Sequence, residues 1–117
     1  MRMMIAAAVA AFAAGPLWAE LVKVEDQRKF VQLINGQTLT RPLVRLTMSP
    51  DGRIQGRASL WNIRDTWSWQ DGFFCRDLFW GGDALGYNCQ EVQASADGRI
   101  KFTSDHGAGD SAVFSLR

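Results

Sequence analysis

One small group of residues in this 117-residue chain has the side chains needed for hydrolysis. His106, the single histidine, stands beside Asp105, with Ser104 and Ser111 nearby. Serine, histidine and an acid catalyse acyl transfer when the histidine takes the serine proton and the acid orients the histidine. Adjacency along the chain does not supply that geometry, and the sequence has no nucleophile elbow. We therefore expect His106 to be a solvated loop residue.

A second pattern would bind a dinucleotide. The segment from Gly107 to Ala112 matches G-x-G-x-x-A, which holds a pyrophosphate where a strand leads into it and a helix and another strand follow. Only eight residues follow Gly109, too few for that unit. We predict a hairpin loop here and no cofactor.

The first 19 residues have the layout of a secretory signal peptide. Arg2 is positively charged, Met3 through Ala14 are apolar, and Gly15-Pro16 precede Leu17-Trp18-Ala19. The apolar run is shorter than the about 20 residues that cross a bilayer, so no membrane anchor should remain after cleavage. We predict cleavage after Ala19, a single domain over residues 20–117, and a periplasmic or secreted location.

Both cysteines, Cys75 and Cys89, lie in the mature part, where an oxidising compartment would join them in a disulfide. Two cysteines and one histidine are too few for a usual metal site. Removal of residues 1–19 takes away Arg2 as the only charged side chain and leaves twelve basic against twelve acidic residues. This balance gives no basic surface for nucleic acid or an anionic membrane.

The mature part predicts a mainly β fold with one short N-terminal helix. Phe30, Leu33 and Ile34 have helical spacing between Asp26, a suitable N-cap, and Gly36, so the helix should run from Asp26 to Asn35. Short alternating segments separated by glycine turns then indicate an antiparallel meander that forms a small barrel or a curled sheet. The expected strands are Leu43–Met48, Arg53–Leu60, Asp65–Gln70, Phe73–Trp80, Tyr87–Ala94, Arg99–Ser104 and Ala112–Leu116. The tetrapeptide Asp-Gly-Arg-Ile occurs at 51–54 and 97–100, which we interpret as one turn used twice.

Two constraints fix the register of the central strands. A two-residue turn at Asp71-Gly72 pairs Trp67 with Arg76, and directly opposed cysteines pair Arg76 with Asn88. Alternation then separates two faces. One face carries Trp67, Trp69, Phe74, Leu78, Trp80 and Val92, together with Arg76, Asn88 and Gln90. The other carries Phe73, Phe79, Tyr87 and the disulfide, with Ser68, Gln70, Asp77 and Glu91. The tryptophans favour the first face as the core.

Three polar side chains would therefore lie among aromatic rings, and this arrangement has two interpretations. The face could line a lumen that binds an anionic or carbonyl-bearing ligand. Its candidate ligand-binding residues are Arg76, Asn88, Gln90, Trp67, Trp69 and Trp80. Alternatively, Arg76 is hydrogen bonded to Asn88 and Gln90 and stacked on Trp67 in a packed core. The sequence favours this network, because cross-strand arginine–aromatic pairs are common in sheets.

Four stretches resemble a family of small exported proteins of alphaproteobacteria. They are INGQTLTRP at 34–42, WSWQDGFFCRD at 67–77, GYNCQ at 86–90 and FTSD at 102–105. The resemblance covers nearly the whole mature chain, supports export and the Cys75–Cys89 bond, and adds no catalytic residue. Some members carry the label dihydrodipicolinate reductase. True reductases of that name are cytoplasmic, longer, and open with a nucleotide-binding unit that this sequence lacks.

Two classes of function remain. We favour a non-catalytic exported domain that binds a small molecule or a protein partner, by analogy of fold with small exported β-barrel inhibitors. The alternative is an enzyme, either the labelled reductase or a hydrolase that uses His106.

Overall fold

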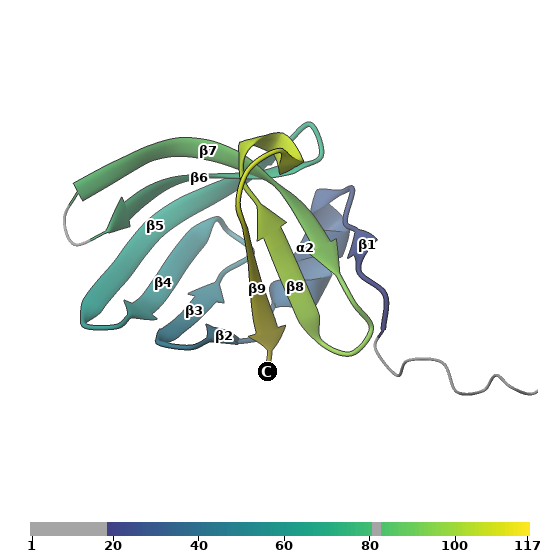
Figure 1. Ribbon diagram of the computed structural model, residues 1–117, viewed down its shortest axis with the longest axis horizontal. Coiled ribbons are helices and arrows are strands. Elements are labelled where there is room, and N and C mark those ends of the chain that lie inside the picture. Colours follow the sequence, from purple (N-terminus) through teal and green to yellow (C-terminus); the bar gives the residue numbers. More distant parts are fainter. Residues whose placement is uncertain (1–18, 81–82) are drawn as a thin grey trace, which may run out of the picture.

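A computed structural model describes residues 19–80 and 83–117 of the protein, and Figure 1 shows their arrangement. Apart from Ala19, the predicted signal peptide lies outside these residues. The described part holds nine strands, the helix α2 (Gln27–Ile34) and the short 3₁₀ helix η3 (Asp105–Gly107). The strands are β1 (Val22–Lys23), β2 (Leu39–Arg41), β3 (Val44–Met48), β4 (Arg53–Ala58), β5 (Trp61–Gln70), β6 (Phe73–Trp80), β7 (Asp83–Ala94), β8 (Arg99–Thr103) and β9 (Ser111–Leu116).

Eight of these strands close into an antiparallel barrel. Each strand from β2 to β9 pairs with the next along the chain, and β9 then pairs with β2 through Leu39–Leu116 and Thr40–Ser115. The short strand β1 adds to β7 beside Ala94. A mainly β fold with a small barrel is therefore confirmed, and closure leaves no long free edge between the first and last strands of the ring.

The central register agrees with the prediction. Trp67 pairs with Arg76, Cys75 with Cys89, and Arg76 with Asn88. The repeated tetrapeptide also forms the same turn twice. Ser49 and Ser95, each two residues before the aspartate, hydrogen bond to that aspartate and accept the backbone N–H of the following arginine.

Two strands begin four residues earlier than predicted, and β9 begins one residue earlier. β5 starts at Trp61, because its first half, Trp61–Thr66, pairs with β4 and only Trp67–Gln70 pairs with β6. β7 starts at Asp83 instead of Tyr87, because the glycine-rich segment continues the pairing with β6 through a bulge between Leu78 and Phe79. Gly86 has a φ of +93°, which a glycine adopts easily, so the glycine serves the bulge instead of a loop.

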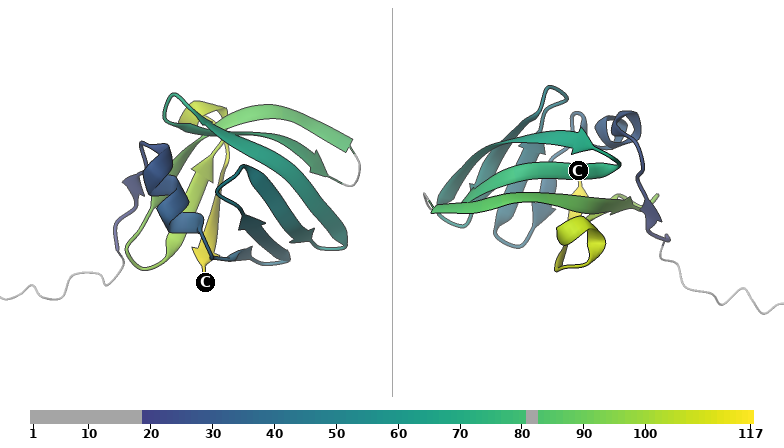
Figure 2. Two further views of the ribbon diagram at one scale, coloured as in Figure 1. Left: turned by 180° about the vertical axis from the view of Figure 1, so that it is seen from behind. Right: turned by 90° about the horizontal axis from the view of Figure 1, so that it is seen from above.

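The helix follows its sequence signals. Asp26 caps it by accepting the backbone N–H of Lys29 at 2.8 Å, and Gly36 follows it with a φ of +76°. Seen from behind, α2 lies in front of the strands, beside β1 and β8 (Figure 2). Its apolar side inserts Phe30 and Ile34, both fully buried, into one end of the barrel. Within the described residues no helix is long and apolar enough to cross a membrane.

Candidate ligand cavity

The end of the barrel beside α2 is filled with rings. The ring of Phe30 lies 5.1 Å from the rings of both Trp67 and Trp69, centroid to centroid, and 5.2 Å from that of Phe74. Phe102 completes the cluster from β8. Two of the candidate ligand-binding residues, Trp67 and Trp69, thus belong to a packed core in which edge and offset contacts between rings add to burial. Trp80 ends β6, and its side chain lies outside the described part of the structure.

The other end of the barrel is hollow. A cavity of about 510 Å³ lies there, with mostly aliphatic and aromatic walls. Its apolar lining consists of Pro42, Leu43, Val44, Leu46, Met48, Ile54, Ala58, Ile63, Phe74, Phe102, Ala112 and Phe114. Its polar lining consists of Arg41, Ser59, Asp65, Arg76 and Gln90. The lumen interpretation from the sequence placed Arg76 and Gln90 at such a site, and both side chains face this cavity.

Two adjacent turns mark the mouth of the cavity. Leu43, in the turn between β2 and β3, lines the cavity and is still 78% exposed. Its carbonyl oxygen accepts the backbone N–H of Ser59, from the turn between β4 and β5, at 2.6 Å. Leu60 and Trp61 follow Ser59 and are also exposed. Leu43 is therefore an apolar side chain that both lines the cavity and is accessible from outside.

Arg76 brings a positive charge into this space. Burial lowers the pKa of its guanidinium, and the charge of Asp65 opposes that shift. An arginine side chain nevertheless remains a cation near neutral pH. Among the described residues, none forms a hydrogen bond or an ion pair with it. Its N–H donors thus face the cavity without a protein partner.

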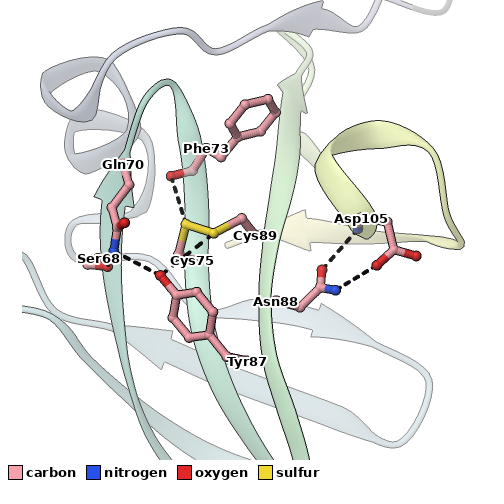
Figure 3. Close-up of a disulfide and its surroundings, with 8 residues drawn as sticks. All are labelled: Ser68, Gln70, Phe73, Cys75, Tyr87, Asn88, Cys89 and Asp105. Atoms are coloured by element: carbon pink, nitrogen blue, oxygen red, sulfur yellow. Dashed lines mark hydrogen bonds between the residues drawn. A yellow bond between two sulfur atoms is a disulfide. The ribbon is translucent and has the colours of Figure 1, made fainter.

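The network favoured by the sequence is therefore wrong. The side-chain amide of Asn88 donates to Asp105 Oδ1 at 2.8 Å, and its oxygen accepts the Asp105 backbone N–H at 3.0 Å. Gln90 donates to Ser104 Oγ at 3.2 Å. The reason is that β8 pairs only with residues 91–94 of β7. Asn88 and Gln90 come before this paired part of β7, beside the segment that follows β8, and they bond to Ser104 and Asp105 of that segment. Figure 3 shows Asn88 pointing away from β6 toward Asp105.

Asp65 is the functional candidate that the sequence did not identify. Its Oδ1 accepts the backbone N–H of Thr66 at 2.8 Å, whereas its Oδ2 is buried without a hydrogen-bond partner among the described residues. Burial is the main cause that raises the pKa of Asp65. Alternation along β5 would have placed Asp65 on the face of Trp67 and Trp69. Asp65 was missed because the faces were assigned only from Trp67 onward, where the turn at Asp71-Gly72 gives each residue a partner on the next strand.

The outer face of the same strands carries the disulfide. Cys75 and Cys89 are bonded as predicted, and their Cα atoms are 3.9 Å apart. The Tyr87 hydroxyl lies next to them and accepts a hydrogen bond from Gln70 Nε2 at 2.8 Å (Figure 3). The disulfide therefore joins β6, which carries Arg76, to β7, which carries Gln90, on the face opposite to these two side chains.

The catalytic alternatives find no assembled site. His106 packs edge-on against Phe73, with ring centroids 4.6 Å apart. Ser104 accepts from Gln90, Ser111 bonds to Thr103, and Asp105 bonds to Asn88. The segment from Gly107 to Ala112 runs from the end of η3 into β9, within the hairpin that joins β8 to β9. This agrees with the predicted hairpin, and no helix follows the glycines as a dinucleotide site requires.

The fold and the site together define a closed eight-stranded antiparallel β-barrel with a hollow interior that opens beside two turns. No protein-family model matches the chain, and no curated protein or solved structure matches it either. The cavity and its residues therefore carry the proposal of function.

Proposed function

We propose that this protein is an exported, non-catalytic binding protein that holds a small, largely apolar molecule in the open half of its barrel. The observation that carries the proposal is the cavity of about 510 Å³. Small-molecule sites commonly measure about 300–1,000 Å³ and combine apolar walls with a few polar groups. This cavity has both properties, with Arg41, Ser59, Asp65, Arg76 and Gln90 as its polar residues.

The location belongs to the proposal as well. The layout of residues 1–19 is typical of an export signal, and the Cys75–Cys89 bond is compatible with an oxidising compartment. A periplasmic or secreted protein that binds apolar molecules would shield them from water. The exposed Leu43 at the mouth supports entry of such a molecule from outside.

A neutral apolar dye, N-phenyl-1-naphthylamine, tests the proposal with purified mature protein. We expect its fluorescence to rise and to saturate at one dye per protein. Ala112, which lines the cavity, should be changed to phenylalanine so that the new ring occupies the space. The Ala112→Phe variant should lose most of the dye binding.

Val113→Phe is the matched control, because Val113 follows on the same strand with its side chain exposed outside the barrel. It should bind the dye as the unchanged protein does. Unfolding curves of both variants check that each is folded. The proposal would be abandoned if the unchanged protein gave no saturable signal, or if folded Ala112→Phe bound the dye as well as Val113→Phe.

A further inference from the structure

Two opposite charges face the same cavity from neighbouring strands without meeting. Trp67, opposite Arg76, is the first residue of β5 that pairs with β6. Asp65 stands two residues before Trp67 on the same face of β5, and the charges of Asp65 and Arg76 act on each other. The two charged groups form no ion pair, and both residues line the cavity. A space bordered by one acceptor and one set of donors therefore lies between them.

Each charge lacks what a ligand could supply. Asp65 Oδ2 is a buried acceptor without a donor, and the Arg76 guanidinium is a set of donors without an acceptor. The buried Asp65 oxygen without a partner costs free energy, whereas the Arg76 nitrogens are not fully buried and remain accessible beside the cavity. One ligand group that both donates and accepts hydrogen bonds would satisfy both.

The charges of the cavity disfavour charged ligands. The lining also includes Arg41, but Arg41 is exposed and its guanidinium lies 5.6 Å from the centre of the Phe114 ring, so Asp65 and Arg76 are the charges that a buried head group would meet. A ligand carboxylate that reaches Arg76 would face the carboxylate of Asp65, and a ligand ammonium that reaches Asp65 would face the guanidinium. A third charge would also have to leave water for a mostly apolar cavity, which carries a large desolvation cost. A neutral head group avoids both penalties.

We infer that the cavity selects an amphiphile with an uncharged head group that is both donor and acceptor, such as a hydroxyl or a primary amide. The head donates to Asp65 Oδ2 and accepts from Arg76, and the apolar part lies against the aliphatic and aromatic walls. This inference rests on the proposed function and adds the chemical class of the ligand.

Four molecules with the same ten-carbon chain provide the test at pH 7.5: decanamide, decan-1-ol, decanoate and decylammonium. Each competes with N-phenyl-1-naphthylamine for the unchanged protein. We expect the amide and the alcohol to displace the dye at concentrations about tenfold lower than the two charged molecules, a difference that corresponds to about 1.4 kcal/mol. Equal displacement by all four would overturn the inference.

Two variants with a lost charge make the test directional. Asp65→Asn removes the repulsion of a carboxylate, so decanoate should gain about tenfold while decylammonium does not. Arg76→Gln removes the repulsion of an ammonium group, so decylammonium should displace the dye at a lower concentration than it does with the unchanged protein, while decanoate does not. The controls are Asp110→Asn and Arg64→Gln, which remove the same charges from exposed side chains outside the cavity and should leave the ranking unchanged.

The outcomes separate the two proposals. Absence of saturable dye binding to the unchanged protein contradicts the proposed function itself. Dye binding without preference among the four head groups, or an equal change for all four in both cavity variants, contradicts only the choice of ligand. If a variant does not fold, the order in which the four molecules displace the dye from the unchanged protein still tests the inference.

Discussion

The two ends of the barrel interior are formed by the same strands and differ in what fills them. Strand β5 passes through both, with Trp67 and Trp69 at the closed end and Ile63 and Asp65 at the open end. At the closed end, α2 inserts Phe30 among the rings of β5, β6 and β8. No helix enters the open end, where the described residues leave a cavity.

This difference shows that strand sequence alone does not decide whether a small barrel is packed or hollow. Eight strands enclose an interior that side chains can just fill or that can hold one small ligand. Here aromatic side chains fill one end of that interior, and one of them, Phe30, comes from α2 and not from a strand of the barrel. At the open end Ala58 and Ala112 provide little volume, and the charges of Asp65 and Arg76 disfavour collapse.

The largest effect should come from removal of the residue that closes one end. Phe30→Ala deletes a fully buried ring that touches four others and should cost about 3–5 kcal/mol in free energy of unfolding. Phe114→Ala at the open end should cost clearly less, because Phe114 is only partly buried and already borders a cavity. Urea titrations followed by tryptophan fluorescence compare the two. Equal costs would mean that the ends do not differ in packing.

The disulfide supports both ends at once. It joins two cysteines that are 14 residues apart in sequence and lie on neighbouring strands. The Cys75→Ala, Cys89→Ala double variant should therefore lose about 2–4 kcal/mol in free energy of unfolding. We expect the dye affinity of the folded variant to change by less than about threefold, since the bond lies on the outer face, and threefold is below 1 kcal/mol. A stable variant that no longer binds the dye would show that the disulfide shapes the cavity.

Arg76 should contribute little to stability although it is mostly buried. Its guanidinium has no hydrogen-bond partner among the described residues, so Arg76→Ala should alter the free energy of unfolding by less than about 0.5 kcal/mol, the range of surface substitutions. The comparison requires equal slopes in urea. A loss of about 1–3 kcal/mol would instead support the internal network that the sequence favoured.

The smallest effect concerns Asp65 and pH. Because burial raises the pKa of its carboxyl in the folded state, the folded protein binds this proton more readily than the unfolded chain. The ionised form therefore destabilises the fold at neutral pH, and this cost disappears as pH falls through the folded-state pKa toward 3.8, the ordinary value. Asp65→Asn should unfold at a slightly higher temperature than the unchanged protein at pH 7.

The temperature difference should narrow as the pH approaches 4. Asp110→Asn, which removes an exposed carboxylate that does not act on Asp65, separates the effect of Asp65 from that of net charge. A difference that widened on acidification would contradict the raised pKa.

Local signals predicted much of this fold. The cap at Asp26, the turn at Asp71-Gly72 and the opposed cysteines each act over a few residues or a single strand pair, and together they predicted the helix and the central register. The closure of the ring by β2 and β9 could not be predicted in the same way, because no turn connects these strands. The end of the barrel that α2 fills also depends on contacts between residues far apart in sequence, such as Phe30 with Phe102, and local signals do not show these contacts.

The site was predicted only in part. Arg76 and Gln90 face the cavity, as the lumen interpretation expected, whereas the preferred network failed because η3 supplies partners for Asn88 and Gln90. The contacts of Asn88 and Gln90 with Asp105 and Ser104 depend on which residues of β7 pair with β8. The sequence did not show where that pairing begins. Alternation along the expected strand Asp65–Gln70 held the information for Asp65, which was left without a face because no residue of the next strand was paired with it.

Closure of the ring has a consequence for the order of folding. Thr40 and Ser115, which pair when the ring closes, are 75 residues apart in sequence, whereas hairpins such as β5–β6 join neighbours. Bringing distant segments together has an entropic cost that rises with loop length, and folds that depend on such contacts form slowly. We expect the hairpins to form first and β2–β9 pairing to be the late, rate-limiting step. Until then the sheet has two unpaired edges, and its lifetime in that state governs how readily copies of the chain aggregate.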